Sequence, residues 1–470
     1  MIKFYTTLFE LDLTNQKITF VEENNLFYDY FLKGHSLPFS FTLDDELEKK
    51  LEFISDYNAA PNTLIYEGKL LNNDDFDDAS LEIKSLTGKT LHGIIRYGKS
   101  SIPLLETPLS KLLFTKVSVN DIAIHAADVC TQSWPESAYN FPMIIDNKFN
   151  RDSNYEDFRG FQNLYENGAF VKNTSYYDSE ENKEFPRNYN ILTPHIYLIE
   201  ILKIGFESAN LIMKGDLVND IEFQKIVYNP DNHLEKIGLN DVNQFKDSFN
   251  LSDFVPDMTF GGYLTKLKNW LNLDVTYRKN IVTINYIDRN FKDIEFKDAR
   301  QFETLKRKII PVGNKVYKLS YSDSNYLHVD RLGLVSSPNV FAKVKEISIG
   351  ISLLEHTSLD GTTTAEIKED DDSFRVLLYN GLQSGLNVAV DNVFTRTFSL
   401  AEVYDRFWKK WLTFRLNSKT IKSSFKTSKD ILSVNDGIHS YNNNQLIKKM
   451  TKRKDSKGIY SISKESETLY

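Results

Sequence analysis

The sequence predicts a mainly β protein of the α+β class, with a barrel-like β domain at each end of the chain. Short alternating segments separated by turn residues fill residues 1–115, and the alternation returns over residues 301–470. Residues 191–300 mix helical and strand patterns, which indicates a small helical or mixed α/β domain between the two ends. Residues 116–190 are rich in aromatic residues, Asn and Asp, with prolines that interrupt helices, so we expect a long irregular insertion there.

Length, composition and charge limit the possible classes. A chain of 470 residues exceeds one core, and 41% hydrophobic residues are enough for globular packing. The net charge of −8 argues against a dedicated nucleic-acid binder. A single cysteine, Cys130, excludes an internal disulfide and a Cys-based zinc site. The N-terminus shows no secretion signal and no apolar run reaches the length of a membrane span, so we expect synthesis in the cytoplasm and no membrane segment.

The N-terminal part reads as a series of strands. Residues 9–13 and 37–43 alternate between apolar and polar side chains, as half-buried strands do. Residues 63–71 and 81–86 lie on either side of an Asn- and Asp-rich turn at 72–78, and we expect them to pair as a hairpin. The acidic residues of this turn lack the spacing and the closing Glu of an EF-hand, so a calcium site is not expected.

Four aromatic residues stand out in the insertion: Trp134, Tyr139, Phe141 and Phe149. A long loop inside a compact domain is usually functional, and its natural role here is contact with a neighbouring subunit. We therefore predict these four residues as interface candidates. An irregular but internally packed insertion explains the same composition equally well. Trp134 would also suit stacking on a sugar ring.

The mixed region carries signals for two helices and a hairpin. Thr193 and Pro194 have the order of an N-cap and a first helical residue, and the apolar run over 196–206 predicts a buried helix after them. A second helix is expected over 261–271, with one apolar face. It leads into a strand pair over 275–286.

An aromatic helix is the clearest element of the C-terminal part. Ser399 and Glu402 form the capping-box pair that satisfies free amides at a helix start. An amphipathic helix over 400–414, packed on strands, is predicted by apolar side chains at the spacing of one helix face. These side chains are Leu400, Val403, Tyr404, Phe407, Trp408, Trp411 and Leu412. Strands are expected at 420–425 and, after an Asn-rich turn, at 445–449.

No catalytic arrangement is visible in the sequence. The eight histidines are scattered and none stands four residues from another, so the His-Glu-x-x-His helix of a metalloprotease is absent. The nucleophile elbow, the Walker phosphate loop and the dinucleotide fingerprint are absent as well. An acidic stretch at 366–372 is expected to be an exposed loop. We therefore predict no catalytic, cofactor-binding or metal-ligating residue, no cofactor and no enzymatic activity.

A family resemblance rests on the order of several short motifs. The aromatic helix with Tyr404, Phe407 and Trp408 is followed by an aspartate step at Asp430 and a strand that ends at 445–449. This order resembles the C-terminal part of tailed-phage tail or baseplate hub proteins. The N-terminal part is similar to the first domain of such hubs, through its Ser-Leu-Pro-Phe turn into a strand and its Tyr-Glu-Gly-Lys-Leu hairpin arm.

The resemblance implies a structural virion protein. Hub proteins of this type are usually trimers, in which two barrels per chain let a threefold ring meet a sixfold tail tube. We therefore expect a homo-oligomeric hub or baseplate ring that joins the tail tube to the tail tip and contacts other tail proteins. It would be made in the host cytoplasm, reside in the virion tail and bind no nucleic acid specifically. Two alternatives stay open: a carbohydrate- or receptor-binding tail module, and a tail-associated glycan hydrolase.

Overall fold

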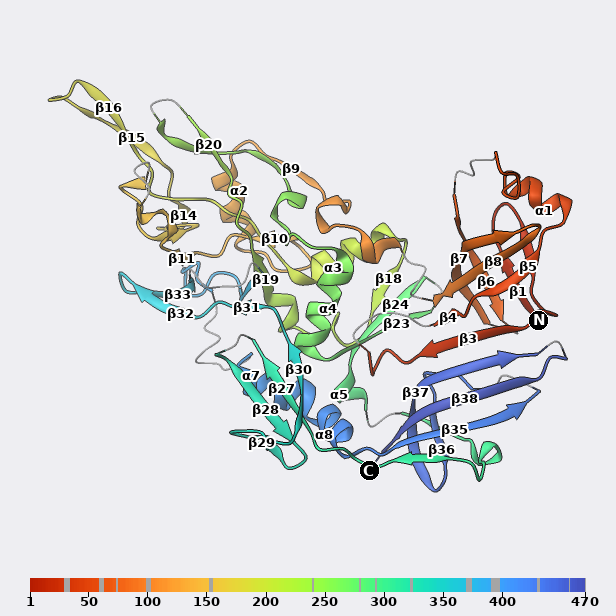
Figure 1. The fold of residues 1–470 in the computed structure, drawn as a ribbon. Helices are drawn as coiled ribbons and strands as arrows, with labels where there is room; N and C mark the ends of the chain where they lie inside the picture. The colour runs from red at the N-terminus through yellow and green to blue at the C-terminus, as the bar shows by residue number, and fades with distance from the viewer. Residues whose placement is uncertain are drawn as a thin grey trace.

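A computed structural model of the chain (Figure 1) describes residues 1–28, 34–58, 63–72, 75–98, 103–151, 155–238, 241–278, 280–291, 294–321, 324–368, 374–389, 398–428, 432–455 and 457–469. Three features of the sequence lie outside these ranges: Asp430, residues 73–74 of the predicted turn, and residues 369–372 of the acidic stretch. The protein is mainly β with few helices, as predicted. No helix among the described residues is long and apolar enough to cross a membrane.

The N-terminal residues form a strand-rich unit with its own core. Its elements are β1 (Ile2–Tyr5), β2 (Glu10–Asp12), β3 (Ile18–Glu23), β4 (Gly34–Ser36), β5 (Phe39–Thr42), α1 (Asp45–Lys50), β6 (Ile65–Asn72), β7 (Asp75–Thr87) and β8 (Thr90–Tyr97). The predicted hairpin is confirmed, because β6 and β7 pair antiparallel from Ile65 with Glu82 to Asn72 with Asp75. Alternate side chains of the strands point inward, among them Phe4, Phe20 and Leu81, which are fully buried.

The two ends of the chain share one sheet. The C-terminal strands are β25 (Phe296–Asp298), β26 (Lys308–Ile310), β35 (Thr420–Thr427), β36 (Gly437–Ser440), β37 (Asn443–Lys454) and β38 (Tyr460–Thr468). Strand β3 pairs antiparallel with β37, which joins these strands to the N-terminal unit in one 14-stranded sheet. Its main path runs β2-β1-β6-β7-β8-β4-β3-β37-β38-β35-β26, and the described strands form no closed barrel. The two ends are therefore one continuous sheet, and the predicted division of the chain into four segments stays a prediction.

Charged side chains cross the β3–β37 seam on both sides of the sheet. Lys452 Nζ lies 3.1 Å from Glu22 Oε2, and both side chains are nearly buried, at 5% and 6% exposure. The Tyr97 hydroxyl donates to Glu22 Oε1 at 3.2 Å. On the other face, Lys449 Nζ lies 2.7 Å from Glu23 Oε1, and the lysine is 42% exposed. The seam thus contains one buried and one solvated ion pair between the same two strands.

The aromatic helix contains a π-helical segment that the sequence did not predict. Ser399 Oγ accepts from the Glu402 amide at 3.3 Å, so the predicted start is confirmed. The helix then runs as α7 (Leu400–Val403), a π-helix (Tyr404–Trp408) and α8 (Lys409–Asn417). Two amides after the π-helix, those of Lys410 and Trp411, donate to the buried Asp288 carboxylate, each at 2.8 Å. The Asp288 carboxylate, from a distant part of the sequence, therefore accepts hydrogen bonds from the backbone amides that follow the π-helix.

The middle of the chain contains three longer helices, α2 (Ile122–Val129), α3 (Leu198–Ser208) and α4 (Phe260–Leu271). A short helix, α5 (Ile287–Asn290), follows them. The predicted hairpin is confirmed as β23 (Leu273–Arg278) with β24 (Ile281–Tyr286), and β18 (Ile212–Lys214) extends it. The predicted helix start at Thr193 is wrong, because α3 begins at Leu198. The Thr193 amide instead donates to Asn163 Oδ1 at 2.7 Å, and residues 195–196 form a strand.

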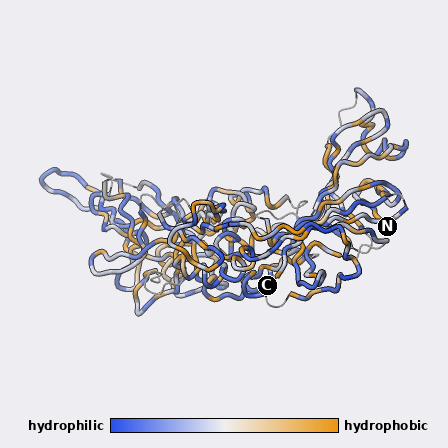
Figure 2. The backbone as a smooth tube through the Cα atoms, turned by 60° about the horizontal axis from the view of Figure 1, so that its bottom comes forward, coloured by the Kyte–Doolittle hydropathy of each residue, from blue (hydrophilic) through white to orange (hydrophobic). Residues whose placement is uncertain are grey.

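The insertion over 116–190 is built from short strands and a capped helix. It contains β9 (Lys116–Ser118), β10 (Tyr139–Asn140), β11 (Ile144–Asp146), β12 (Phe161–Gln162), β13 (Tyr165–Glu166), β14 (Ala169–Phe170), β15 (Thr174–Asp178) and β16 (Lys183–Arg187). Asp121 caps α2, a helix that the sequence analysis missed. Figure 2 shows an elongated molecule, with the N-terminal unit rising at one end and a hairpin leaving the other. That hairpin is β15–β16, labelled at the upper left of Figure 1.

Smaller sheets complete the fold. A four-stranded sheet contains β27 (Lys315–Ser320), β28 (Tyr326–Asp330), β29 (Gly333–Val335) and β30 (Lys343–Ser348). The other strands are β17 (His195–Ile196), β19 (Ile226–Asn229), β20 (Glu235–Ile237), β21 (Asn243–Phe245), β22 (Ser248–Asn250), β31 (Ser352–Leu353), β32 (His356–Leu359), β33 (Thr362–Ile367) and β34 (Arg375–Leu378). Short 3₁₀ helices are Pro103–Glu106, Leu109–Lys111, Lys148–Arg151, Phe223–Lys225, Leu251–Phe254 and Arg300–Phe302.

Candidate functional site

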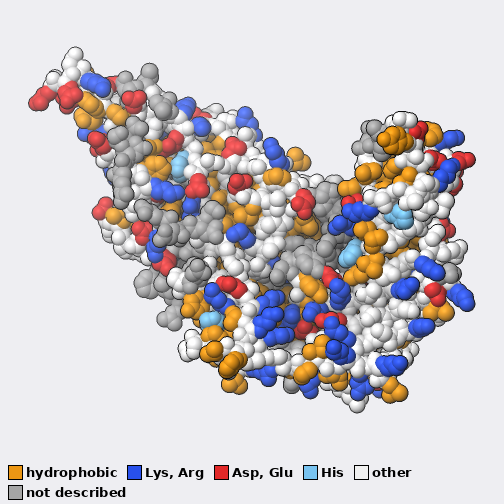
Figure 3. All heavy atoms as spheres, in the orientation of Figure 1, with side chains coloured by type: hydrophobic (Ala, Val, Ile, Leu, Met, Phe, Trp, Pro, Cys, Tyr) orange, Lys and Arg blue, Asp and Glu red, His pale blue; other side chains and the backbone are white. Residues whose placement is uncertain are grey.

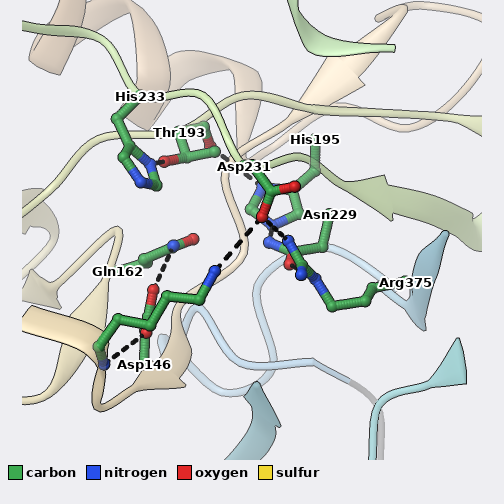
Figure 4. Close-up of polar contacts among 9 residues, drawn as sticks. Asp146, Gln162, Thr193, His195, Asn229, Asp231, His233 and Arg375 are labelled. Carbon is green, nitrogen blue, oxygen red and sulfur yellow. Dashed lines mark hydrogen bonds and ion pairs between the residues drawn. The ribbon is translucent and has the colours of Figure 1, made fainter. Parts of the chain in front are cut away.

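A cluster of buried polar side chains lies where β17, β19 and β34 meet (Figure 4). His195 is fully buried, and its Nδ1–H donates to the Thr193 carbonyl at 3.0 Å. Its Nε2 accepts from Asn229 Nδ2 at 2.9 Å, and Asn229 Oδ1 accepts from Arg375 Nε at 2.9 Å. Burial lowers the pKa of His195 to about 3, so the ring is neutral. Both ring nitrogens are engaged in fixed bonds, and the histidine has no free position for proton transfer.

The outer part of the same cluster reaches the surface. Arg375 Nη2 donates to Asp231 Oδ1 at 2.5 Å, and Lys148 Nζ lies 3.3 Å from the same oxygen. His233 Nδ1 lies 2.7 Å from Thr193 Oγ1, and burial lowers the pKa of His233 to about 4. These bonds join four separate strands and loops. The cluster therefore ties together segments of the middle region that are distant in the sequence.

Two cavities each have a single carboxylate in their lining. One of about 420 Å³ is lined by Lys116, Asn232, His233, Leu234, Lys246, Ser248, Phe249, Asn250, Asp253 and Phe254. One of about 120 Å³ lies between α4, α8 and β30, and Glu346 is the carboxylate in its lining. Glycoside hydrolysis requires two carboxylates across the scissile bond, and each of these cavities has one. The described residues also contain no group of three His, Cys, Asp or Glu side chains that could hold a metal ion.

The thiol of Cys130 is not a nucleophile in this structure. It is fully buried, and burial raises its pKa to about 12, so it stays protonated at neutral pH. The neighbouring His125 is turned to another partner, because its Nε2 lies 2.7 Å from the Tyr139 hydroxyl. No thiol–imidazole pair forms.

The structure separates the four predicted interface residues into two pairs. Tyr139 and Phe141 are buried among other rings of the chain itself, so they belong to its own core. The alternative of an internally packed insertion therefore describes these two residues. Trp134 is half-buried, and its indole donates to Glu200 Oε2 at 2.9 Å. Phe149 is half-buried against Tyr155. For Trp134 and Phe149, an interface role stays a prediction.

The β15–β16 hairpin projects from the chain as an arm. Tyr176 stacks on Phe185 with ring centroids 5.7 Å apart, and Arg187 lies over the Tyr176 ring at 4.3 Å. Tyr177, on the opposite side of the strand, is 59% exposed. A two-stranded ribbon is marginally stable in water. An aromatic pair on a protruding ribbon is therefore a surface that a partner could cover.

A second surface lies at the end of the large sheet. Residues 305–310, here called the β26 strip, are all exposed, and Leu305 and Ile309 are 99% and 50% accessible. Three of the six residues are basic and three are aliphatic. Figure 3 shows hydrophobic and Lys or Arg side chains side by side along the lower rim, where Figure 1 places β35 and β36. This strip was not predicted, although the run from 304 to 321 contains five basic residues and no acidic one.

No family model matches the chain, and no curated protein matches it in sequence. The 43 kDa tail protein of prophage MuSo2 from Shewanella oneidensis is similar in structure, at 7% identity over 98% of this chain and 97% of that one, with a TM-score of 0.39. A tail protein from Neisseria meningitidis is similar at 7% identity over 99% and 95%, with a TM-score of 0.37.

A third similar solved structure is also that of a tail protein. The prophage tail protein gp18 from Listeria monocytogenes is similar at 10% identity over 99% of this chain and 94% of that one, with a TM-score of 0.32. These three solved structures are all tail proteins, the class that the sequence motifs resemble.

Proposed function

We propose that this chain is a structural protein of a phage tail, which assembles as a trimeric hub or baseplate ring that joins the tail tube to the tail tip. The observation that carries the proposal is the position of its exposed large hydrophobic side chains. Eight of these side chains lie on edge strands, hairpins and the loops beside them, at Tyr177, Ile309, Ile310, Leu332, Leu334, Val340, Phe341 and Val344. Exposed apolar groups on strand edges are typical of surfaces that pair with another chain.

The shared sheet supports a ring-forming role. Both ends of the chain contribute to it, so the N-terminal unit and the C-terminal strands are held together by hydrogen-bonded ladders and not by a linker. Strand β26 ends the main path of this sheet, and β30 ends the path of the smaller one. Edge strands carry backbone donors and acceptors that natural monomers usually cover or blunt. Copies placed side by side would cover them.

The polar groups favour a structural role over a catalytic one. Both nitrogens of the buried His195 are engaged, and the 420 Å³ cavity has a single carboxylate, Asp253. A sugar-binding role centred on Trp134 would need its indole face free, yet the ring is half-buried and held by Glu200. A glycan array with the wild type and Trp134→Ala would show this role through binding that the variant loses.

The oligomeric state and the place of the protein in the virion test the proposal. Light scattering after size exclusion should give the mass of three chains, and antibody-labelled particles should carry the label on the tail. A purified chain that stays monomeric at every concentration, together with tails that carry no label, would overturn the proposal.

A further inference from the structure

The arm has one edge that can accept another strand. In the β15–β16 ladder Ser175 faces Pro186, and a proline cannot donate to its partner strand. Because antiparallel pairs alternate, Ser175 and Tyr177 turn their backbone amides and carbonyls to the outer edge of β15. On the other strand Pro186 removes an outward donor, which weakens that edge for pairing. Strand β15 therefore offers the open edge of the arm.

The tip of the arm is acidic. Four carboxylates and one lysine lie between residues 178 and 184, and Asp178 closes the turn by accepting from the Glu180 and Glu181 amides at 2.8 and 3.1 Å. The β15–β16 hairpin that carries these residues extends from one end of the molecule (Figure 1). A compact negative charge at the end of a projecting ribbon favours a positive partner surface.

The β26 strip is positively charged, in contrast to the acidic tip of the arm, and Tyr441 holds it in place. Lys306, Arg307 and Lys308 follow one another, and Lys308 lies directly across from Lys422 in the β26–β35 ladder. Lys422 is itself paired with Glu465 at 2.6 Å, so the positive charge of this edge comes from the three consecutive basic side chains of the strip, which favour an acidic partner surface. The segment is fixed by Tyr441, whose hydroxyl accepts from the Thr304 amide at 2.9 Å and whose ring lies 4.6 Å below the Arg307 guanidinium.

We propose that the β15–β16 arm of one copy docks along the β26 strip of a second copy and extends its sheet. Backbone bonds between β15 and β26 would supply the pairing, as in strand addition. Glu180 and Glu181 would meet Lys306 and Lys308, and Tyr177 would cover Ile309. The inference rests on the proposed ring, since it names the surfaces through which copies meet.

The placement of the two surfaces requires a second copy. Figure 1 shows the arm at one end of the molecule and the strands of the strip's sheet near the other, so the arm cannot reach its own strip. A contact between two different patches is heterologous, and such contacts form closed rings when their rotation closes. A ring of copies would satisfy every arm and every strip.

A charge exchange tests the contact. Lys306→Glu with Lys308→Glu, and separately Glu180→Lys with Glu181→Lys, should each weaken association by at least about tenfold, because like charges then face each other. The chain with all four substitutions should associate within a few-fold of the wild type. Lys17→Glu with Lys49→Glu, exposed lysines of the N-terminal unit, is the matched control and should change nothing. Failure of the fourfold variant to recover would overturn the pairing.

Cross-linking locates the contact independently. Ser179→Cys with Lys308→Cys should join copies through a short bismaleimide, and Cys130 gives no background because it is buried. Each single variant should stay uncoupled. Coupling of a single variant to itself would indicate a symmetric contact and overturn the proposal. If the wild type forms rings that none of these variants affects, the arm contact is wrong while the proposed function stands. If the wild type never associates, both are wrong.

Discussion

The buried ion pair at the β3–β37 seam gives the sharpest test of the shared sheet. Lys452→Met removes the ammonium group that lies 3.1 Å from Glu22 Oε2, while the methionine keeps most of the side-chain volume. The Glu22 carboxylate would then stay buried without this cation. Removing one member of a buried pair costs about 3–5 kcal/mol, since the remaining charge has lost its solvation and its partner. We expect a loss of that size in the free energy of unfolding.

The neighbouring pair provides a control on the same two strands. Lys449→Met removes the ammonium group that lies 2.7 Å from Glu23 Oε1, but this lysine is 42% exposed and its charge is solvated. Solvated pairs contribute about 0–1 kcal/mol. The two lysine variants should therefore differ by about 3 kcal/mol. Glu22→Gln combined with Lys452→Met should recover most of the loss, because no buried charge is left unpaired.

Urea unfolding gives the free energies, and hydrogen exchange locates the change. Lys452→Met should speed exchange at the amides of β3 and β37 more than at those of β23 and β24, which belong to another sheet. Equal free energies for the two lysine variants would refute the reasoning. So would faster exchange spread evenly over the chain, because the ion pair would then not act at the seam.

Three further variants test single contacts. Burial raises the pKa of Asp288 from 3.8 to about 6. The stability that this carboxyl group contributes is therefore complete below pH 3.8 and lost as the pH rises through 6. Asp288→Ala should lower the free energy of unfolding in urea by up to about 3 kcal/mol more at pH 4 than at pH 7.5. Gly205→Ala would place a Cβ in steric overlap with the Phe260 ring and should cost about 1–3 kcal/mol in thermal melting, whereas Gly262→Ala meets nothing closer than 3.4 Å and should cost nothing. Asn229→Ala removes the side-chain amide that bridges His195 and Arg375 (Figure 4). It should lower the free energy of unfolding in urea by about 2–5 kcal/mol.

Local elements were predictable because their causes are local. The capping pair at Ser399 and the apolar stripe behind it fixed the start and the buried face of the aromatic helix. The hairpin of β23 and β24 followed from alternation on either side of a turn. The π-helix within the aromatic helix was not predictable, because the acceptor for the amides behind it is Asp288, more than a hundred residues away. Nothing in the spacing of the stripe indicates that partner.

Pairing between strands that are far apart in the sequence could not be predicted. Residues 18–23 and 449–454 form one ladder, and neither pattern identifies the other as its partner. Two barrel-like ends were expected, and one continuous sheet was found. The aromatic residues of the insertion show the same limit, since Tyr139 and Phe141 are apolar enough for an interface or a core. Burial depends on which other segments pack there, and the sequence gives no direct measure of it.

The continuity of the sheet has a consequence for any ring that this chain forms. Strands β35, β38 and β37 lie between β26 and β3, and each is bonded to the next. A neighbour that docks at β26 would therefore be connected to the N-terminal unit through strand ladders alone. Lateral ladders are stiffer than the loops that usually join domains, because every step fixes several backbone hydrogen bonds. The angle between the N-terminal unit and the neighbouring copy would then be set by the twist of one sheet. Weakening the seam at Lys452 should loosen that angle while leaving the contact at β26 intact.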